Sequence, residues 1–188
     1  MDLVQLHSCS EAELRKGDVI AALQQARQKG YTRYIGYSGD GQAAKFAIEC
    51  GAFDTLQTSV SIADQEAIEL TLPLARERQM GVIVKRPLAS AAWRYGDEVP
   101  MDYHKPYWEQ LRKLKYDFLA DPKKAVAVAL RFTLSVPGVH TAIVGTTKPG
   151  RWRENAALLA EGPLPAEQFD AIRRRWRDAA EPSWVGQT

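Results

Sequence analysis

The chain has 188 residues, of which 45% are hydrophobic and 26% charged, and its formal net charge is +2. This length is enough for one domain with a sizeable core, and the near-neutral charge gives no sign of a nucleic-acid-binding surface. The first residues contain neither a basic region nor a long apolar run, which predicts no secretory signal and no membrane span. Two cysteines without metal-ligand spacing, Cys9 and Cys50, predict a reduced, cytoplasmic protein, and we assign no metal site.

Apolar residues recur with the periods of strands and helices along the chain. Strands are expected at residues 2–7, 32–37, 55–60, 81–85 and 141–144. Helices are expected at residues 18–29 with Asp18 as N-cap, then at 42–49, 65–79, 107–119 and 121–134, and from Pro165 onward. The remaining segments are predicted as a polar loop at 8–17, a long functional loop with aromatic residues at 92–106, and a solvated basic helix face at 173–177.

This alternation of strands and helices with short connections predicts a parallel sheet with helices outside it. Polar residues stand where the strands end, and in parallel α/β folds ligands bind at that carboxyl edge. A doubly wound sheet would usually carry a Gly-x-Gly-x-x-Gly turn after its first strand, and this chain has none. A barrel of eight βα units fits the loops better, and five such units are present.

The stretch after the last strand has the pattern of a strand, a small polar turn and a helix N-terminus. Gly145 ends the strand, Thr146 and Thr147 bring hydroxyls, and Pro149 suits the first turn of a helix. Free N–H groups and the helix dipole favour an anion at such a place, and Arg151 adds a planar guanidinium that suits phosphate. The residues leave two interpretations open: an anion site, or an ordinary capped helix after a strand.

Several segments in the same order resemble the aldo-keto reductases, which are (β/α)8 barrels that reduce carbonyls with NADPH. The matching segments are YIGYS at 34–38, LQ at 56–57, PLA at 87–89 and GTTKPGRWREN at 145–155. The resemblance implies an α/β fold that is a partial (β/α)8 TIM barrel, with about five parallel βα units that correspond to barrel strands 4 to 8. It also implies that residues 1–188 form a single partial barrel domain, from which the three N-terminal βα units are absent.

The same resemblance assigns roles to individual residues. His7 is similar to the active-site histidine that polarises the substrate carbonyl, and Ser38 and Gln57 to the residues that bind the nicotinamide carboxamide. The segment that runs along the cofactor ring and pyrophosphate contains Arg86, Pro87 and Leu88. Many members have an aromatic residue to stack on the nicotinamide where this chain has Lys85.

The stretch that follows the last strand is similar to the family's NADP(H) adenosine site. Its cofactor-binding residues are Gly145, Thr146, Thr147, Arg151, Glu154 and Asn155. Within this set, Thr146 and Arg151 correspond to the pair that holds the 2′-phosphate, and Glu154 and Asn155 to the adenine contacts. Some members have a lysine at the position of Gly145, so Arg151 is the principal charge of this site.

The resemblance implies an NADPH-dependent reductase of an aldehyde or ketone, truncated so that the family's active-site Asp, Tyr and Lys are missing. The alternatives are a non-catalytic NADP(H)-binding or regulatory module, and an inactive fragment. Five strands leave the first and last strands as open edges. The expected partners are therefore a small carbonyl substrate and either a complementary half-barrel chain or a second copy in a homodimer, with no nucleic acid and no membrane.

Overall fold

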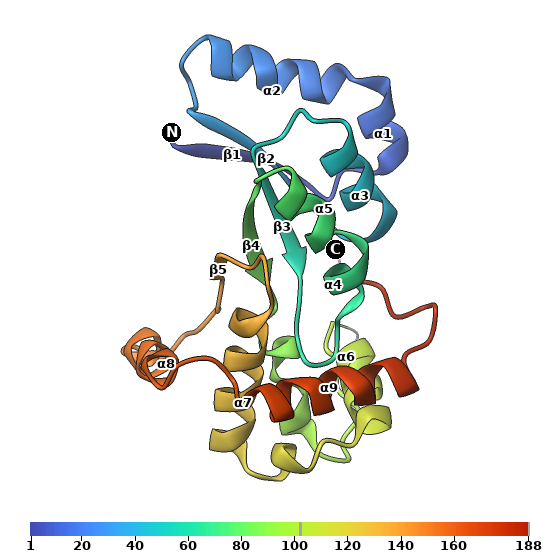
Figure 1. Ribbon diagram of the computed structural model, residues 1–188, viewed down its shortest axis with the longest axis vertical. Coiled ribbons are helices and arrows are strands. Elements are labelled where there is room, and N and C mark those ends of the chain that lie inside the picture. The colour runs from blue at the N-terminus through green and yellow to red at the C-terminus, as the bar shows by residue number, and fades with distance from the viewer. Residues whose placement is uncertain (102, 188) are drawn as a thin grey trace.

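The computed structural model describes residues 1–101 and 103–187. Five parallel strands form one sheet in sequence order: β1 (Leu3–His7), β2 (Tyr34–Ser38), β3 (Thr55–Ser59), β4 (Gly81–Lys85) and β5 (Thr141–Ala142) (Figure 1). The predicted parallel α/β fold is confirmed. β5 is shorter than predicted, although Ile143 N still donates to Val84 O at 2.8 Å.

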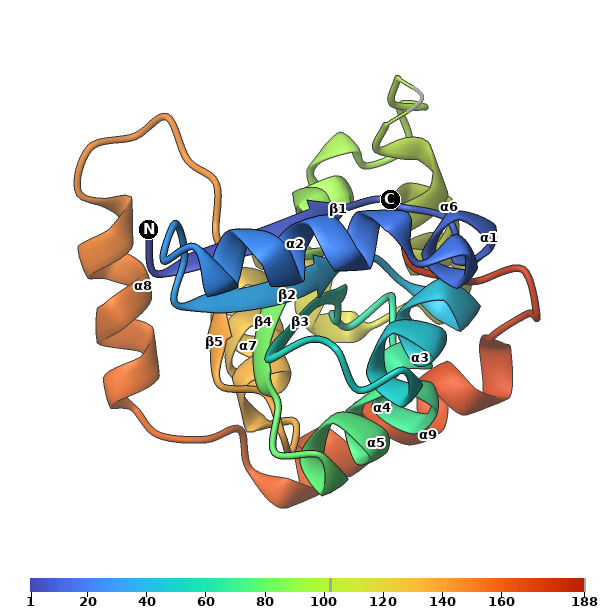
Figure 2. The same cartoon turned by 90° about the horizontal axis from the view of Figure 1, so that it is seen from above.

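Helices follow each strand. They are α1 (Glu11–Lys16), α2 (Asp18–Gln28), α3 (Gly41–Glu49), α4 (Glu66–Leu70), α5 (Leu72–Glu77), α6 (Lys105–Leu114), α7 (Pro122–Ser135), α8 (Arg151–Ala160) and α9 (Ala166–Ala179), with two 3-10 helices, η1 (Ala89–Tyr95) and η2 (Asp117–Ala120). The strands are contacted by α2, α3, α5 and α7 (Figure 2). Over residues 1–101 and 103–187, no helix combines the length and apolarity needed to cross a membrane.

The core lies between the sheet and the helices that cover it. Its fully buried side chains include Ile35, Tyr37 and Leu56 from the strands and Ile48 and Phe132 from the helices. Gly36 lets β2 approach β3, because a Cβ at this position would collide with the Thr55 side chain. Gly36 and Thr55 are partners in the ladder that also places Ser38 level with Gln57.

The sheet is open at both sides. Within the part of the chain that the structure describes, β1 pairs only with β2 and β5 pairs only with β4. The expected open edges are therefore present, and their apolar residues are incompletely covered: Leu3 to Leu6 are only half-buried and Ile143 is 51% exposed. Ile143 is exposed because β5 has no neighbour beyond it within these residues.

Some predicted element boundaries are also wrong. The polar loop at 8–17 contains α1, whose N-cap Ser10 accepts a hydrogen bond from Glu13 N at 3.2 Å. Gly17 (φ +85°), and not Asp18, is the N-cap of α2. Residues 65–79 form two helices instead of one, because the backbone departs from helical geometry at Thr71.

Corrections also apply to three later segments. The loop at 92–106 contains the end of η1 and the start of α6, and its residue 102 lies outside the described residues. Pro149 lies before α8 and not in its first turn. The basic run is not uniformly solvated, because Arg173 is buried and donates to Gln65 Oε1 at 2.6 Å and to Glu69 Oε1 at 2.7 Å.

Candidate functional site

Three of the predicted site residues form one row across the carboxyl ends of neighbouring strands. In the parallel ladders, His7 of β1 is level with Ser38 of β2, and Ser38 is level with Gln57 of β3. The row continues into the loops, where Ser8 N donates to Ser38 O at 2.9 Å and Gly39 N donates to Gln57 O at 3.0 Å. The structure therefore brings these three side chains to one edge of the sheet, where parallel α/β folds bind ligands.

The hydrogen bonds within this row define what it offers a ligand. Gln57 Nε2 donates to Ser38 Oγ at 3.2 Å, and Ser38 is buried. This bond uses one amide N–H and a lone pair of the hydroxyl. The Ser38 O–H and the Gln57 amide oxygen are the donor and the acceptor that complement a carboxamide.

His7 is exposed at the end of β1, and its Nδ1 lies 2.9 Å from Ser8 Oγ. Ser8 adopts a left-handed backbone conformation with φ +53°, which is uncommon for a residue with a side chain. The contact occupies Nδ1 and leaves Nε2 as the ring nitrogen for a ligand. Sequence reasoning missed Ser8, although its place directly after a strand end was a usable signal.

A second cluster lies at the ends of β3 and β4. Asp40, in the turn after β2, accepts hydrogen bonds from Ser59 N at 2.6 Å, from Thr58 Oγ1 at 2.9 Å and from Lys85 Nζ at 2.6 Å. The side chains of Asp40 and Lys85 are only 5% and 13% exposed. Lys85 is therefore held in a buried ion pair.

The segment after β4 is anchored on several sides. Arg86, with φ +55°, donates from Nε to Tyr103 Oη at 3.2 Å and from Nη1 to Ser59 Oγ at 3.4 Å. The Pro87 carbonyl accepts a hydrogen bond from Thr133 Oγ1 of α7 at 3.1 Å. Leu88 packs against the core. Arg86, Pro87 and Leu88 thus continue the carboxyl edge past β4.

The remaining predicted cofactor residues gather around the start of α8. Thr146 Oγ1 accepts from Lys148 N at 3.1 Å, and the Arg151 guanidinium pairs with the Glu154 carboxylate at 2.7 Å. Asn155 is buried, and its Oδ1 has no hydrogen-bond partner within the described part of the chain. The N-cap of α8 is Gly150, which supplies no side-chain cap.

The site residues therefore form three groups in strand order. Gly145 and Thr147 lie exposed in the loop between β5 and α8. In both overall views α8 stands beside α7, on the β5 side of the sheet (Figures 1 and 2). His7 ends the strand at the opposite edge. The row of His7, Ser38 and Gln57 and the cluster at the ends of β3 and β4 lie along one edge of the sheet. The residues around the start of α8 lie close to one another but apart from His7.

Sequence reasoning also missed a buried acid near the second cluster. Tyr107 Oη donates to Asp64 Oδ2 at 3.0 Å. Burial raises the pKa of Asp64 to about 8, and the negative charge of Asp40 adds to this effect. The Asp64 carboxyl is therefore mainly protonated at neutral pH. Only the three-dimensional structure brings Asp64 and Tyr107 together, since 43 positions separate them.

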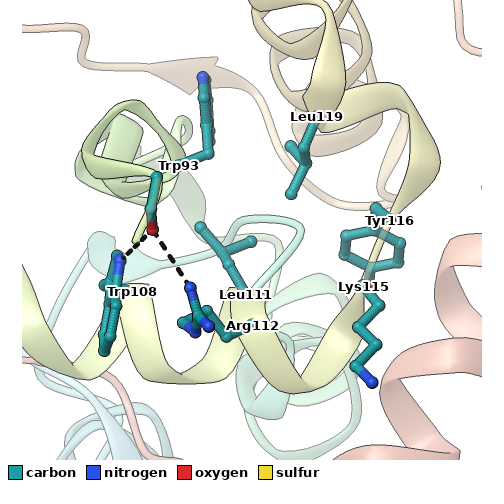
Figure 3. A pocket seen from close by; sticks show the side chains of 8 residues that line it. Trp93, Trp108, Leu111, Arg112, Lys115, Tyr116 and Leu119 are labelled. Carbon is teal, nitrogen blue, oxygen red and sulfur yellow. Dashed lines mark hydrogen bonds between the residues drawn. The ribbon is translucent and has the colours of Figure 1, made fainter. Parts of the chain in front are cut away.

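A cavity of about 360 Å³ lies between η1, α6 and the segment after α6. Aromatic and aliphatic side chains line it, among them Trp93, Trp108 and Tyr116 (Figure 3). Trp108 Nε1 and Arg112 Nη1 both donate to the Gly96 carbonyl, at 2.9 and 3.3 Å. None of the predicted site residues lines this cavity.

Known proteins resemble the chain in sequence. A model of the aldo/keto reductase family matches residues 1–177. The uncharacterized oxidoreductase YqkF of Bacillus subtilis is 26% identical over 186 residues, and an L-galactose dehydrogenase of Arabidopsis thaliana is 25% identical over 176 residues. These matches cover 92% and 86% of the chain but 59% and 54% of the two relatives, so the chain spans little more than half of their length.

Solved structures match the fold. The apo form of the aldo-keto reductase AKR11C1 from Bacillus halodurans superimposes with a TM-score of 0.79 at 24% identity, and its holo form with a TM-score of 0.75 at 22% identity. Both matches cover 97% of the chain, and they cover 64% and 63% of the two solved chains. The open five-stranded sheet therefore has the arrangement of part of that protein.

Proposed function

The chain belongs to the aldo/keto reductase family, and we propose that it binds NADP(H) along the carboxyl edge of its sheet and takes part in hydride transfer to an aldehyde or ketone. The observation that carries this proposal is the row formed by His7, Ser38 and Gln57. In this row a hydrogen-bond donor for a carbonyl oxygen stands next to a donor and an acceptor that suit a carboxamide. The names of both relatives, an oxidoreductase and a dehydrogenase, support the same class of reaction.

The residues present fit the proposed cofactor. Ser38 and Gln57 bind its carboxamide, and the cations of Lys85 and Arg86 suit its pyrophosphate. The uncapped N-terminus of α8 and Arg151 suit the 2′-phosphate. The strongest evidence for this fit is Asn155 Oδ1. It is a buried acceptor without a partner within the described residues, and a donor such as the adenine amino group would satisfy it.

Bound NADPH supplies the hydride, and the protein groups orient and polarise the substrate. We infer that the Ser8 hydroxyl donates to His7 Nδ1, so that the imidazole carries its proton on Nε2. The Nε2–H then donates to the substrate carbonyl oxygen as negative charge develops there. Because His7 is exposed at the strand end, a substrate reaches it from solvent.

The tyrosines closest to the core do not suit the role of proton donor. Tyr37, Tyr107 and Tyr116 donate their hydroxyls to Cys9 O, Asp64 Oδ2 and Ile62 O. Burial raises the pKa of Tyr37 to about 12, and it also raises the pKa of the other two. We therefore propose that turnover needs the Asp, Tyr and Lys that the resemblance assigns to other βα units.

We propose that a complementary half-barrel chain supplies those groups, whereas a second copy of this chain would cover the open edges without supplying them. The open edges of β1 and β5 support this, because unpaired strand edges bind further strands. The two free cysteines, Cys9 and Cys50, support a reduced and cytoplasmic location.

A second candidate function is a non-catalytic NADP(H)-binding or regulatory module. It is favoured because the hydroxyls of the buried tyrosines already donate hydrogen bonds within the protein.

Two fluorescence experiments test these functions in sequence. NADPH is first titrated into the purified chain, and binding is followed by the change in nicotinamide emission. Binding supports both functions, whereas no change at high micromolar NADPH contradicts both. An aldehyde panel is then added: turnover by this chain alone contradicts our assignment of the proton donor, and turnover that appears only with a complementary half-barrel supports the reductase.

A further inference from the structure

The last described residues of the chain fold back onto the candidate site. After α9 the chain turns back toward the middle of the molecule (Figures 1 and 2), and Gln187 reaches Lys85 and Arg86. Trp184 is buried in the core and anchors this return. We call residues 183–187 the tail segment. No feature of the sequence indicated its position.

Two cations of the site converge on one atom of the tail segment. The Gln187 carbonyl oxygen accepts a hydrogen bond from Lys85 Nζ at 2.6 Å and another from Arg86 Nη1. Lys85 already has the Asp40 carboxylate as its counter-ion, but the described partners of Arg86 are neutral oxygens, and a phosphate oxygen would be a stronger partner for its guanidinium. The tail segment therefore occupies a position that suits an anion.

The fit of the tail segment depends on Gly186. A Cβ at this position would collide with the Asp40 carboxylate. Beside Gly186, Gln187 Nε2 is buried and has no partner within the described residues. The segment is thus seated closely against the Asp40–Lys85 pair, but one of its own polar groups is left unsatisfied, which weakens its hold.

We propose that the tail segment is a built-in competitor of the cofactor, which must leave Lys85 and Arg86 before a cofactor phosphate binds them. This inference rests on the proposed function, because that function places the pyrophosphate at these two residues. The apparent affinity for NADPH is then the intrinsic affinity reduced by the fraction of molecules in which the segment has left. A substitution that displaces the tail segment but leaves every proposed cofactor residue in place therefore strengthens NADPH binding.

The test compares NADPH dissociation constants of three forms of the full chain by fluorescence titration. Gly186→Val places a side chain against Asp40 and expels the segment, so its dissociation constant is expected to fall about tenfold if the segment is seated nine times in ten. Val185→Ala is the control, because Val185 is 48% exposed next to Gly186. It should bind NADPH like the natural chain. If circular dichroism shows that Gly186→Val is unfolded, Gly186→Ala replaces it, since its Cβ meets the same carboxylate.

A synthetic peptide of the sequence PSWVGQT provides a second measurement. Added to Gly186→Val, it is expected to weaken NADPH binding competitively, and the same peptide with valine in place of its glycine is not. Equal NADPH affinity in all three forms overturns the inference and leaves the proposed function standing. Absence of NADPH binding in every form, including the one with an expelled segment, overturns both.

Discussion

Asp40 and Lys85 form a buried ion pair, with Lys85 Nζ 2.6 Å from Asp40 Oδ2. Asp40 also accepts from Ser59 N and Thr58 Oγ1, so one carboxylate connects the turn after β2 with the ends of β3 and β4. The pair therefore positions the edge on which the candidate site is built. It also links the site to the tail segment, because Lys85 donates to both Asp40 and Gln187.

Breaking this pair on one side is expected to destabilise the fold. Lys85→Met leaves the Asp40 charge buried without its cation, so the free energy of unfolding should fall by about 3–5 kcal/mol. Lys16→Met is the control, because its pair with Glu13 is 62% and 41% exposed and solvent screens its contribution to stability. Urea denaturation measures both, and equal losses in the two variants would contradict the assigned role of the pair.

The raised pKa of Asp64 makes stability depend on pH. The pKa lies at about 8 in the folded chain and at 3.8 without burial, so between these values the folded state holds a proton that the unfolded state has lost. The free energy of unfolding should therefore fall as the pH rises from about 4 to 8, by up to ~1.4 kcal/mol per pH unit from this group. The charged groups that act on Asp64 are Asp40, Glu66 and Lys85.

Asp64→Asn tests this dependence, because an amide oxygen still accepts from Tyr107 but the side chain no longer titrates. In urea denaturation at pH 6 and pH 9, the natural chain should lose more stability than the variant between the two values. Identical pH slopes would mean that Asp64 is already ionised at pH 6 in the folded chain.

Ser8 is expected to select the tautomer of His7. With the hydroxyl 2.9 Å from Nδ1, the nitrogen-15 shifts of the His7 ring should show a protonated Nε2 in neutral imidazole. Ser8→Gly removes the hydroxyl and suits the positive φ, so the backbone should stay in place while the two tautomers mix. An unchanged tautomer in Ser8→Gly would remove Ser8 from the proposed role.

Replacing Asn155 should have opposite effects on the stability of the chain and on cofactor binding. Its Oδ1 is buried without a partner, so Asn155→Leu removes an unsatisfied group and should leave the cofactor-free chain as stable or more stable, by about 1 kcal/mol. The same change removes the proposed acceptor for adenine and should weaken NADPH binding about fivefold to tenfold. Urea denaturation and NADPH titration measure the two effects, and unchanged binding would exclude Asn155 from the site.

The sequence predicted the order of strands and helices and the row at the strand ends, because both depend on local patterns. Short buried strands between helices imply a parallel sheet, and in such a sheet His7, Ser38 and Gln57 reach the same edge. Helix α1 was missed although Ser10 and Glu13 have the spacing of a capping box. That signal was present in the sequence.

Other features could not be predicted because they join residues far apart in the sequence. The Asp40–Lys85 pair spans 45 positions, and the contact between Lys85 and Gln187 spans 102. Neither periodicity nor turn chemistry carries information about such contacts. The short, exposed β5 likewise depends on what lies beside it, and not on its own apolar residues.

The central claim is that one NADP(H) molecule binds all three groups of residues, from the carboxyl ends of the strands to the start of α8. Its most direct test is a titration of the nitrogen-15-labelled Gly186→Val chain with NADPH, followed by amide NMR. We predict that the amide signals of Ser38, Gln57, residues 85–89 and residues 145–155 shift together, with a single dissociation constant. Shifts confined to the cavity of Trp93 and Trp108, or no shifts at saturating NADPH, would contradict the claim.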